Sequence, residues 1–255
     1  MNAFSFLNKK DRTKPRSTGL TMMIDRGSGF SYFSDLLENT HQYIDFIKFG
    51  WGTSSMYESQ IVMQKIDKAK SFDIIVYPGG TLLEAAILSG QTDSFFEELQ
   101  NLGFNGIEIS DGSTEVDLDL RYSLIGRAKD LGLHVISEVG KKNPTLDAEI
   151  ELEDRINAIQ FDLEAGSNQV LIEAREAGLG IGIYEKDGSI KDDQLSALAE
   201  IGLDKLIIEA PLKSQQTELL LRYGPSVNLG NIAHEEIIPL ETLRQGLRGD
   251  TLGKI

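Results

Sequence analysis

The sequence has no cysteine and little histidine, and both shortages narrow the chemistry open to it. Among 255 residues there are 0 cysteines and 3 histidines. Without cysteine the chain cannot form disulfides, bind metal through thiolates or use a thiol nucleophile. No Ser-His-Asp arrangement can be read around the histidines, and zinc is disfavoured. His134 begins a predicted strand and is expected to be structural, while His41 and His234 lie in helical patterns and are expected at the surface.

Basic residues are outnumbered, and long apolar runs are missing. The chain has 25 Lys and Arg against 40 Asp and Glu, a formal charge of −15. Nucleic acid would need a basic footprint and is excluded as a partner, although a local basic cluster can still bind an anionic substrate. No apolar run approaches the ~20 residues of a membrane span, and residues 1–17 lack the features of a signal peptide. We expect a cytoplasmic protein that does not bind membranes.

What the sequence does contain is a regular alternation of short apolar runs and helical patterns. Runs rich in Ile and Val predict eight buried strands, at residues 20–25, 44–49, 73–77, 106–110, 134–139, 169–173, 205–209 and 227–229. Helical patterns follow them, at residues 30–40, 57–71, 82–89 with 92–102, 118–131, 151–166, 192–201, 215–223 and 239–247. Eight such repeats predict an α/β fold, a single-domain (β/α)8 TIM barrel over residues 19–255. An open, doubly wound sheet is the alternative.

Residues 1–18 stand apart from this alternation. Five basic residues gather there around Pro15, at positions Lys9, Lys10, Arg12, Lys14 and Arg16. We interpret the segment as a basic N-terminal arm that is mobile and solvated. A role in localisation or in binding a partner is the alternative.

Charged and amide residues stand at nearly every predicted strand end. They are Asp25, Lys48, Tyr77, Glu108 with Asp111, Glu138 with Lys141, Glu173 with Arg175, Glu209, and Asn228 with Asn231. In barrels of this type the active site lies at the carboxyl ends of the strands, so these side chains are expected at one rim. An ion-pair network in the barrel mouth would explain any one of them, whereas the whole set favours a functional site.

The side chains at this rim indicate which metal ion and which kind of substrate it could bind. Carboxylates without cysteine suit Mg²⁺, which prefers oxygen ligands. Positive charge at the same rim suits a substrate that carries phosphate and carboxylate groups; it comes from Lys48, Lys141, Lys142, Arg175 and Lys213. A lysine can also act as general acid or base.

Two further segments could bind anions. Gly79 and Gly80 follow the third strand and could present backbone N–H groups at a helix start, with a tight turn as the equal alternative. Lys213 and Ser214 follow the seventh strand, where such barrels often bind phosphate.

Several of these segments, taken together, resemble the phosphosulfolactate synthase family from about Gly19 to the C-terminus. The motifs are FIKFGWGTS at residues 46–54, YPGGTL at 77–82, EISDGS at 108–113, SEVGKK at 137–142, EAPLKSQQ at 209–216 and GLRGDT at 246–251. The resemblance implies a (β/α)8 barrel that adds sulfite to phosphoenolpyruvate with Mg²⁺, giving (R)-2-phospho-3-sulfolactate. In methanogenic archaea that product opens coenzyme M biosynthesis, and in bacterial relatives it is linked to sulfolactate.

That reaction suggests a role for each rim residue. Lys141 is expected to protonate C2 after sulfite attacks C3, with Lys142 as its alternate and Glu138 beside them. The expected Mg²⁺ ligands are Glu108, Asp111, Glu138 and Glu173. Lys48, Arg175, Lys213 and Ser214, with Gly79 and Gly80, are expected to hold the substrate anions.

Other interpretations share these features. A different phosphoenolpyruvate-using lyase or aldolase would need the same fold and anion-binding groups. A non-enzymatic barrel similar to plant heat-stress proteins is the alternative from another class, but it has no physical reason to keep charges at the rim. The resemblance also makes a homo-oligomer the expected assembly.

Overall fold

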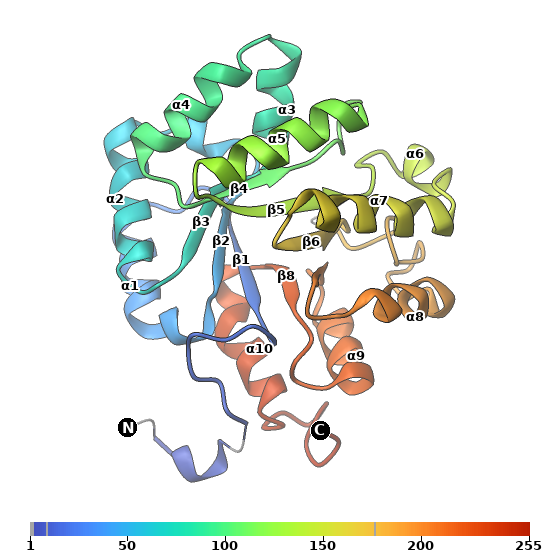
Figure 1. Cartoon of the computed structure of the whole chain (residues 1–255). Helices are drawn as coiled ribbons and strands as arrows, with labels where there is room; N and C mark the ends of the chain where they lie inside the picture. The colour runs from blue at the N-terminus through green and yellow to red at the C-terminus, as the bar shows by residue number, and fades with distance from the viewer. Residues whose placement is uncertain (1–2, 9, 176) are drawn as a thin grey trace.

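The computed structural model describes residues 3–8, 10–175 and 177–255, and its eight parallel strands form a nearly closed barrel (Figure 1). The strands are β1 (Thr21–Asp25), β2 (Phe46–Phe49), β3 (Ile75–Pro78), β4 (Gly106–Ile109), β5 (His134–Val139), β6 (Gln169–Ile172), β7 (Leu206–Glu209) and β8 (Leu229–Ile232). The prediction of a single (β/α)8 barrel is therefore confirmed, and the open doubly wound sheet is wrong.

Helices follow the strands and surround the barrel (Figure 1). The α-helices are α1 (Phe30–Thr40), α2 (Ser59–Lys70), α3 (Gly80–Leu88), α4 (Thr92–Leu102), α5 (Leu118–Asp130), α6 (Pro144–Ala148), α7 (Leu152–Ala165), α8 (Asp192–Ile201), α9 (Lys213–Tyr223) and α10 (Ile237–Arg244). Four 3₁₀ turns are η1 (Ser5–Leu7), η2 (His41–Tyr43), η3 (Thr53–Ser55) and η4 (His234–Glu236). No described helix is long and apolar enough to cross a membrane.

One joint of the barrel lacks a hydrogen-bonded ladder in the described residues. The strand order runs β3-β2-β1-β8-β7-β6-β5-β4, which leaves β3 and β4 as the two edges. The side chain of Asn105 bridges this seam, because its Oδ1 accepts from Val76 N at 2.7 Å and its Nδ2 donates to Ile74 O at 3.2 Å. Farther up, Gly80 N donates to Glu108 Oε1 at 2.6 Å. Side chains thus close the seam in place of strand pairing.

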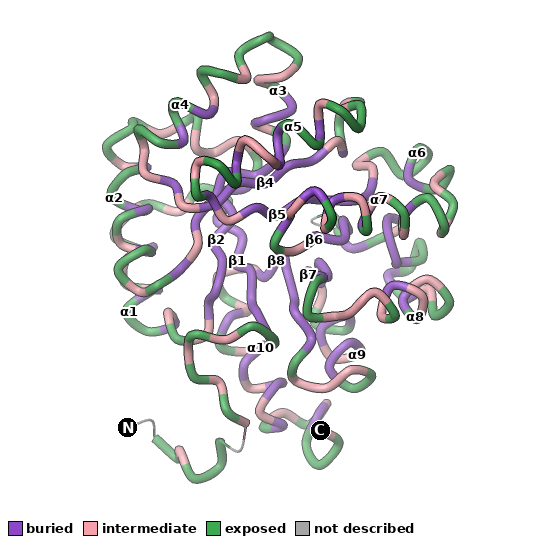
Figure 2. Tube along the Cα trace, viewed as in Figure 1, coloured by how far each residue is buried: buried purple, intermediate pink, exposed green. Residues whose placement is uncertain are grey.

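The core has two layers, one inside the barrel and one between the barrel and the helices (Figure 2). The strands are buried on both faces, which is why they read as continuous apolar runs. The small inner layer includes Met22, Phe46, Ile136, Leu171 and Ile207. The large outer layer is formed where the apolar faces of the helices pack on the outward side chains.

Two boundaries differ from prediction. The eighth strand begins at Leu229 rather than at residue 227, so Asn228 lies at its amino end, where its Nδ2 donates to Leu206 O at 2.9 Å. The expectation that Asn228 reaches the rim is wrong. The short helix α6 was not predicted, because Pro144 starts it and it spans little more than one turn.

The arm packs against the amino-terminal end of the barrel instead of extending into solvent. Arg12 Nε pairs with Glu241 Oε2 of α10 at 3.1 Å, and Arg16 Nη2 pairs with Asp45 Oδ2 at 2.9 Å. Lys14 donates to backbone carbonyls of His41 and Phe72. The expectation of a solvated arm is wrong for these three residues; Lys9 lies outside the described residues.

Candidate active site

The alternation of side chains along each strand builds the site. Successive residues of a strand point to opposite faces, so positions two apart share the inside of the barrel. Phe46, Ile136, Leu171 and Ile207 belong to the inner apolar layer. Two residues farther along the same chain segments, toward the carboxyl ends, come Lys48, Glu138, Glu173 and Glu209. Glu108 joins them from β4, so one charged layer lies directly above the apolar one.

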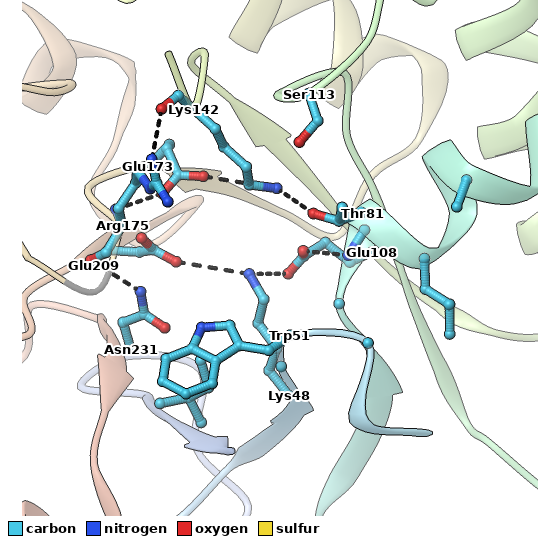
Figure 3. A pocket seen from close by; sticks show the side chains of 17 residues that line it. Lys48, Trp51, Thr81, Glu108, Ser113, Lys142, Glu173, Arg175, Glu209 and Asn231 are labelled. Atoms are coloured by element: carbon cyan, nitrogen blue, oxygen red, sulfur yellow. Dashed lines mark hydrogen bonds and ion pairs between the residues drawn. The ribbon is translucent and has the colours of Figure 1, made fainter. Parts of the chain in front are cut away.

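Lys48 lies at the centre of this layer. Its Nζ is 2.9 Å from Glu108 Oε2, 3.3 Å from Glu138 Oε2 and 3.7 Å from Glu209 Oε1 (Figure 3). All four side chains are almost fully buried. The network therefore holds several charges out of water, where each depends on its neighbours for stabilisation.

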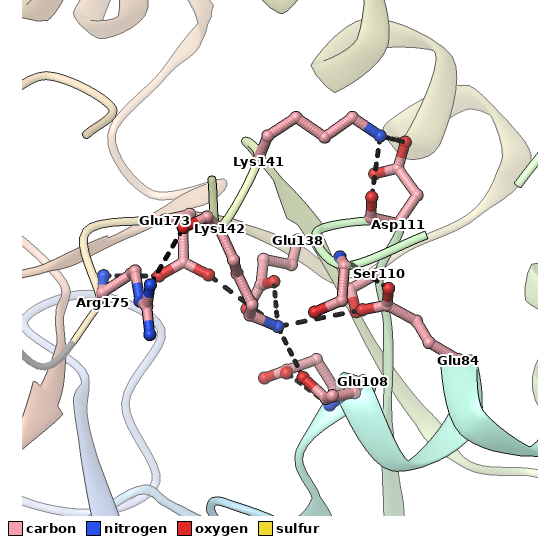
Figure 4. Close-up of polar contacts among 12 residues, drawn as sticks. Glu84, Glu108, Ser110, Asp111, Glu138, Lys141, Lys142, Glu173 and Arg175 are labelled. Carbon is pink, nitrogen blue, oxygen red and sulfur yellow. Dashed lines mark hydrogen bonds and ion pairs between the residues drawn. The ribbon is translucent and has the colours of Figure 1, made fainter. Parts of the chain in front are cut away.

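Lys142 brings a second ammonium group to the same layer from the loop after β5. Its Nζ donates to Thr81 Oγ1 at 2.7 Å and pairs with Glu138 Oε1 at 3.2 Å and Glu173 Oε2 at 3.9 Å (Figure 4). Glu138 consequently contacts a different lysine with each of its two oxygens.

The two central carboxylates have pKa values displaced in opposite directions. Burial alone would raise the pKa of Glu138, but attraction from Lys142 and Lys48 lowers it to about 2. For Glu108, burial together with repulsion from Glu138 outweighs the attraction of Lys48 and raises the pKa to about 7. Neighbouring groups whose pKa values are shifted in opposite directions are characteristic of sites that hold and move protons.

The outer carboxylates and Lys142 are also shifted. Burial, then repulsion from Glu138, raises the pKa of Glu173 well above its ordinary value. Burial likewise raises the pKa of Glu209 despite attraction from Lys48. Burial would lower the pKa of Lys142, but the charge of Glu138 reverses this and raises it. Four carboxyl groups share this layer with two ammonium groups, and the raised pKa values of Glu108, Glu173 and Glu209 show that the layer favours the protonated form of those three.

A cavity of about 590 Å³ opens onto this layer (Figure 3). Its volume falls in the range of small-molecule sites. The described residues that line it include Lys48, Trp51, Gly79, Gly80, Thr81, Glu108, Ser113, Lys142, Glu173, Arg175, Glu209 and Asn231. The ion-pair network and the functional site, which were alternatives for the sequence, are thus the same set of residues.

The Gly79–Gly80 turn lies where it was predicted. Gly79 is the N-cap of α3 and both glycines line the cavity. A Cβ at Gly79 would lie 3.3 Å from Lys48 Cε, so a larger residue would crowd the lysine. In the present arrangement the N–H of Gly80 serves a protein carboxylate, Glu108. The amino end of α3 therefore meets a protein carboxyl group, and the binding of a substrate anion by Gly79 and Gly80 stays a prediction.

The far wall is formed by Arg175 and Asn231, both with backbone in the left-handed region. Their φ angles are 60° and 58°. Arg175 Nη1 donates to Lys142 O at 3.0 Å, and Asn231 Nδ2 donates to Arg175 O at 3.3 Å. Asn231 Oδ1 is buried without a hydrogen-bond partner in the described structure. An unpaired buried acceptor at a strained residue is typical of a ligand-binding position. Glu176, in the same segment, lies outside the described residues.

The structure does not bring Lys141 or Asp111 to the cavity. Lys141 Nζ instead contacts Asp111 Oδ2 and Asp111 O, each at 2.7 Å (Figure 4). Arg121 Nη1 lies 3.4 Å from the other oxygen of Asp111. Both residues are thus engaged with each other outside the cavity lining, and Lys142 occupies the place expected for Lys141.

Lys213 and Ser214 also lie elsewhere. Lys213 is the first residue of α9, and its Nζ pairs with Asp250 Oδ2 at 2.8 Å while remaining about half exposed. Together with Ser214 it lines a separate surface depression. The expected phosphate-binding role of these two residues is not supported by their positions.

Three other expectations concern ionisable groups, two of them near the rim. Asp25 ends β1 but is buried against Lys65 and accepts from Ser28 N at 2.9 Å. His234 is not fully at the surface, since its Nε2 lies 3.5 Å from Asp25 Oδ1 and its side chain is 13% exposed. His134 is structural as predicted and contacts Gln169 at 2.6 Å.

Four residues near the site were missed by sequence reasoning: Thr81, Ser113, Trp51 and Glu84. The first three lie inside the motifs quoted above. Trp51 and Ser113 are in loops and Thr81 is in the first turn of α3, positions where the sequence has no period to show which side chains face the cavity. Glu84 carried a clearer signal, because it is the one charge in the apolar run Leu82–Leu88 of the α3 pattern. A lone charge on a buried helix face indicates a specific partner.

Among the described residues, no group of three or more His, Asp or Glu side chains is arranged to hold a metal ion. The ammonium groups of Lys48 and Lys142 lie between the carboxylates instead. The donor set nevertheless matches Mg²⁺ in type, since it is all oxygen, and in charge, since the carboxylates are in excess.

Comparison with known proteins indicates the same family that the sequence motifs resemble. The family profile described as (2R)-phospho-3-sulfolactate synthase (ComA) matches residues 9–250. The phosphosulfolactate synthase of Methanothermobacter thermautotrophicus is 48% identical over 256 residues, which cover 100% of this chain and 99% of that protein. The phosphosulfolactate synthase of Bacillus subtilis is 38% identical over 255 residues, 98% of this chain and 99% of that protein.

Solved structures of low sequence identity are similar to this chain in fold only. The 3-hexulose-6-phosphate synthase of Salmonella typhimurium superimposes with a TM-score of 0.58 at 12% identity, over 90% of this chain and 100% of that one. A phosphoenolpyruvate phosphomutase from Streptomyces platensis subsp. rosaceus gives 0.54 at 14%, over 92% and 80%.

Proposed function

Because the chain belongs to the (2R)-phospho-3-sulfolactate synthase family, we propose that it catalyses the Mg²⁺-dependent addition of sulfite to phosphoenolpyruvate, giving (2R)-phospho-3-sulfolactate. Members of this family are enzymes of the lyase type, so the non-enzymatic alternative is set aside. The observation that carries the proposed reaction is the Lys142 ammonium group, which lines the cavity beside Lys48 and Arg175.

Charge and size support small anions as substrates. Phosphate, carboxylate and sulfite are all anionic, and three cationic side chains line the cavity. We assign the phosphate to the side of the cavity formed by Thr81 and Ser113, where the amino end of α3 adds backbone N–H groups. Arg175, at the opposite wall, is placed to hold the carboxylate or the incoming sulfite through its planar guanidinium.

The proposed reaction needs one bond formed and one proton delivered. The sulfur lone pair of sulfite forms a bond to C3, and the electron pair of the C2–C3 double bond moves to C2 and onto the carboxylate. Lys142 then transfers a proton from Nζ to C2 and regains it from solvent. Its carboxylate neighbours keep Lys142 protonated before the transfer, because the charge of Glu138 raises its pKa. Lys48 stays ammonium and balances charge at the cavity floor.

Mg²⁺ would be held by Glu108, Glu138 and Glu173, which share the charged layer; Asp111 is excluded because it pairs with Lys141 and Arg121. The bound ion would add positive charge where negative charge develops on the substrate carboxylate. The excess of carboxylates, visible in the raised pKa values of Glu108 and Glu173, supports a cation there.

The proposal is tested by mixing purified protein with phosphoenolpyruvate, sulfite and Mg²⁺ and identifying the product by mass. Sulfite-dependent loss of the enol phosphate, abolished by a chelator and restored by Mg²⁺, is the expected result. Sulfate in place of sulfite is the control, because it lacks the nucleophilic lone pair on sulfur. Consumption only with an added aldehyde would favour an aldol-type reaction, and no consumption by folded protein would refute the proposed chemistry.

A further inference from the structure

Glu84 is a buried carboxylate on α3 that does not itself line the cavity. It is 1% exposed, and the cavity lining includes its neighbours Leu82 and Ala85 but not Glu84. Burying a charge in the apolar part of a helix is costly unless several donors satisfy it. The hydrogen-bond donors around the Glu84 carboxylate therefore show which segment it binds.

Three donors come from one loop, the segment after β4. Ser110 Oγ donates to Glu84 Oε1 at 2.6 Å, while Ser113 N and Thr114 N both donate to Oε2 at 2.7 Å. Charge-assisted hydrogen bonds of this kind are roughly twice as strong as neutral ones. Glu84 thus fixes the 110–114 loop to α3, and Ser113 in that loop lines the cavity.

The same loop holds Lys142. Lys142 N donates to Gly112 O at 2.8 Å. A Cβ at Gly112 would lie 3.2 Å from Lys142 Cγ, so the loop backbone packs directly on the lysine stem. The ammonium group itself lies 3.8 Å from Glu84 Oε1 (Figure 4). Thr81, three residues before Glu84 on the same face of α3, accepts from this ammonium at 2.7 Å.

We infer that Glu84 is a positioning residue for Lys142: it anchors the 110–114 loop to α3 and thereby fixes the backbone, stem and ammonium group of the lysine over the cavity. The kinetic consequence rests on the proposed function, because Lys142 is the proton donor of that reaction. The structural consequence does not, because it concerns the order of the 110–114 loop in the protein without substrate.

The main variant is Glu84→Gln, which keeps the side-chain shape and removes the charge. The matched control is Glu97→Gln, an exposed glutamate of α4. Hydrogen exchange at the amides of Ser113 and Thr114 is measured by NMR without substrate. kcat and KM for sulfite addition are measured separately.

In Glu84→Gln we expect exchange at the two amides to rise at least tenfold. We expect kcat to drop about ten- to a hundredfold with KM little changed, because misplacement of a reacting group lowers the rate more than binding. Glu97→Gln should match the wild type in exchange, kcat and KM. A merely structural role for Glu84 would lower the melting temperature while leaving exchange at the two amides and the kcat of the folded variant at their wild-type values, and that outcome would overturn the inference.

A milder variant decides the matter if Glu84→Gln does not fold. Ser110→Ala removes one of the three donors and leaves the charge of Glu84 in place. Faster exchange at Ser113 and Thr114 with a few-fold loss of kcat supports the anchor, and exchange equal to the wild type refutes it. If the wild type does not add sulfite to phosphoenolpyruvate, the exchange measurements still decide whether Glu84 anchors the loop.

Discussion

At the scale of single residues, the two adjacent lysines after β5 separate what a sequence shows from what a structure adds. The position of Glu138 at a predicted strand end placed it at the rim of the barrel, and there it is fully buried in the charged layer. The alternation ends at Gly140, whose φ of 132° turns the chain. Beyond that turn no period indicates which lysine faces the cavity, so Lys141 and Lys142 could not be ranked from the sequence.

The roles of the two lysines can be tested directly. Lys142→Ala should lower kcat about a hundredfold or more, because a positioned general acid contributes that much. Lys141→Ala is the matched control; it removes the contacts with Asp111 and should lower stability more than turnover. Steady-state kinetics and thermal unfolding of both variants provide the comparison. Equal loss of kcat in the two variants would contradict the assignment.

Glu108 makes stability depend on pH in a direction that can be worked out. Its folded pKa of about 7 lies above the ordinary 4.5, so the folded state binds more protons between pH 4.5 and 7. Its contribution is therefore favourable below pH 4.5 and is lost as the pH rises to 7. Glu138, with its pKa lowered to about 2, acts oppositely and loses its contribution as the pH falls from 4.5 toward 2.

Glu108→Gln mimics the protonated side chain. At pH 8 this variant should be more stable than the wild type, by up to about 3 kcal/mol, and the gain should shrink toward pH 4.5. Urea unfolding between pH 4 and pH 8 measures this difference, with activity lost throughout. A gain that does not change with pH would argue against titration of Glu108 as its source.

At the scale of elements, the loop after β6 shows how a second segment supports the site. Gly178, Gly180 and Gly182 suggested flexibility, yet Gly182 N donates to Asp147 Oδ2 at 2.7 Å, and Asp147 Oδ1 accepts from Lys141 N at 3.0 Å. One buried carboxylate thus ties the loops after β5 and β6 together. The sequence could not predict this tie, because α6, which carries Asp147, is too short to show a helical period.

Gly182→Ala tests how closely this loop packs on the site. A Cβ at Gly182 would overlap the carbonyl oxygen of Glu173, in addition to the strain of a φ of 58°. Gly90→Ala is the control, since its φ is 66° and a Cβ there meets nothing within 4 Å. We expect Gly90→Ala to cost about 1–2 kcal/mol and Gly182→Ala about 1–3 kcal/mol more.

Denaturant unfolding measures the two costs, and kcat shows whether Glu173 has been displaced. Gly182→Ala should lower kcat, whereas Gly90→Ala should not. Equal destabilisation of the two variants would show that the loop moves away without cost and does not support Glu173.

At the scale of the whole molecule, the barrel and its strand ends were predictable because one repeat of a short apolar strand and a helix recurs eight times. The packing of the arm was not, because its contacts reach distant parts of the chain, 27 positions away for Lys14 and His41 and 229 for Arg12 and Glu241. Predictions of a homo-oligomer and of a cytoplasmic location remain, and sedimentation and cell fractionation would test them.

Arg16→Ala tests whether the arm is part of the folded unit. The ion pair with Asp45 is nearly buried, with side chains 8% and 9% exposed. Asp45 also accepts from Thr21 N at the start of β1. Removing one partner leaves a buried charge and should cost about 3 kcal/mol.

The control is Arg222→Ala, whose ion pairs on α9 are solvent-exposed and should contribute less than about 1 kcal/mol. Urea unfolding of both variants makes the comparison. Equal and small losses would show that the arm is dispensable for stability.

The seam between β3 and β4 lacks a hydrogen-bonded ladder in the described residues, so the barrel can open there more easily than between paired strands. Its two free edges carry facing parts of the site, the Gly79–Gly80 turn on one and Glu108 on the other, and they meet through a side chain rather than a ladder. An anion that contacts both the turn and the charged layer would hold the edges of β3 and β4 together. Binding substrate and stiffening the barrel would then be one event, and the enzyme would be most compliant when empty and most resistant to opening when loaded.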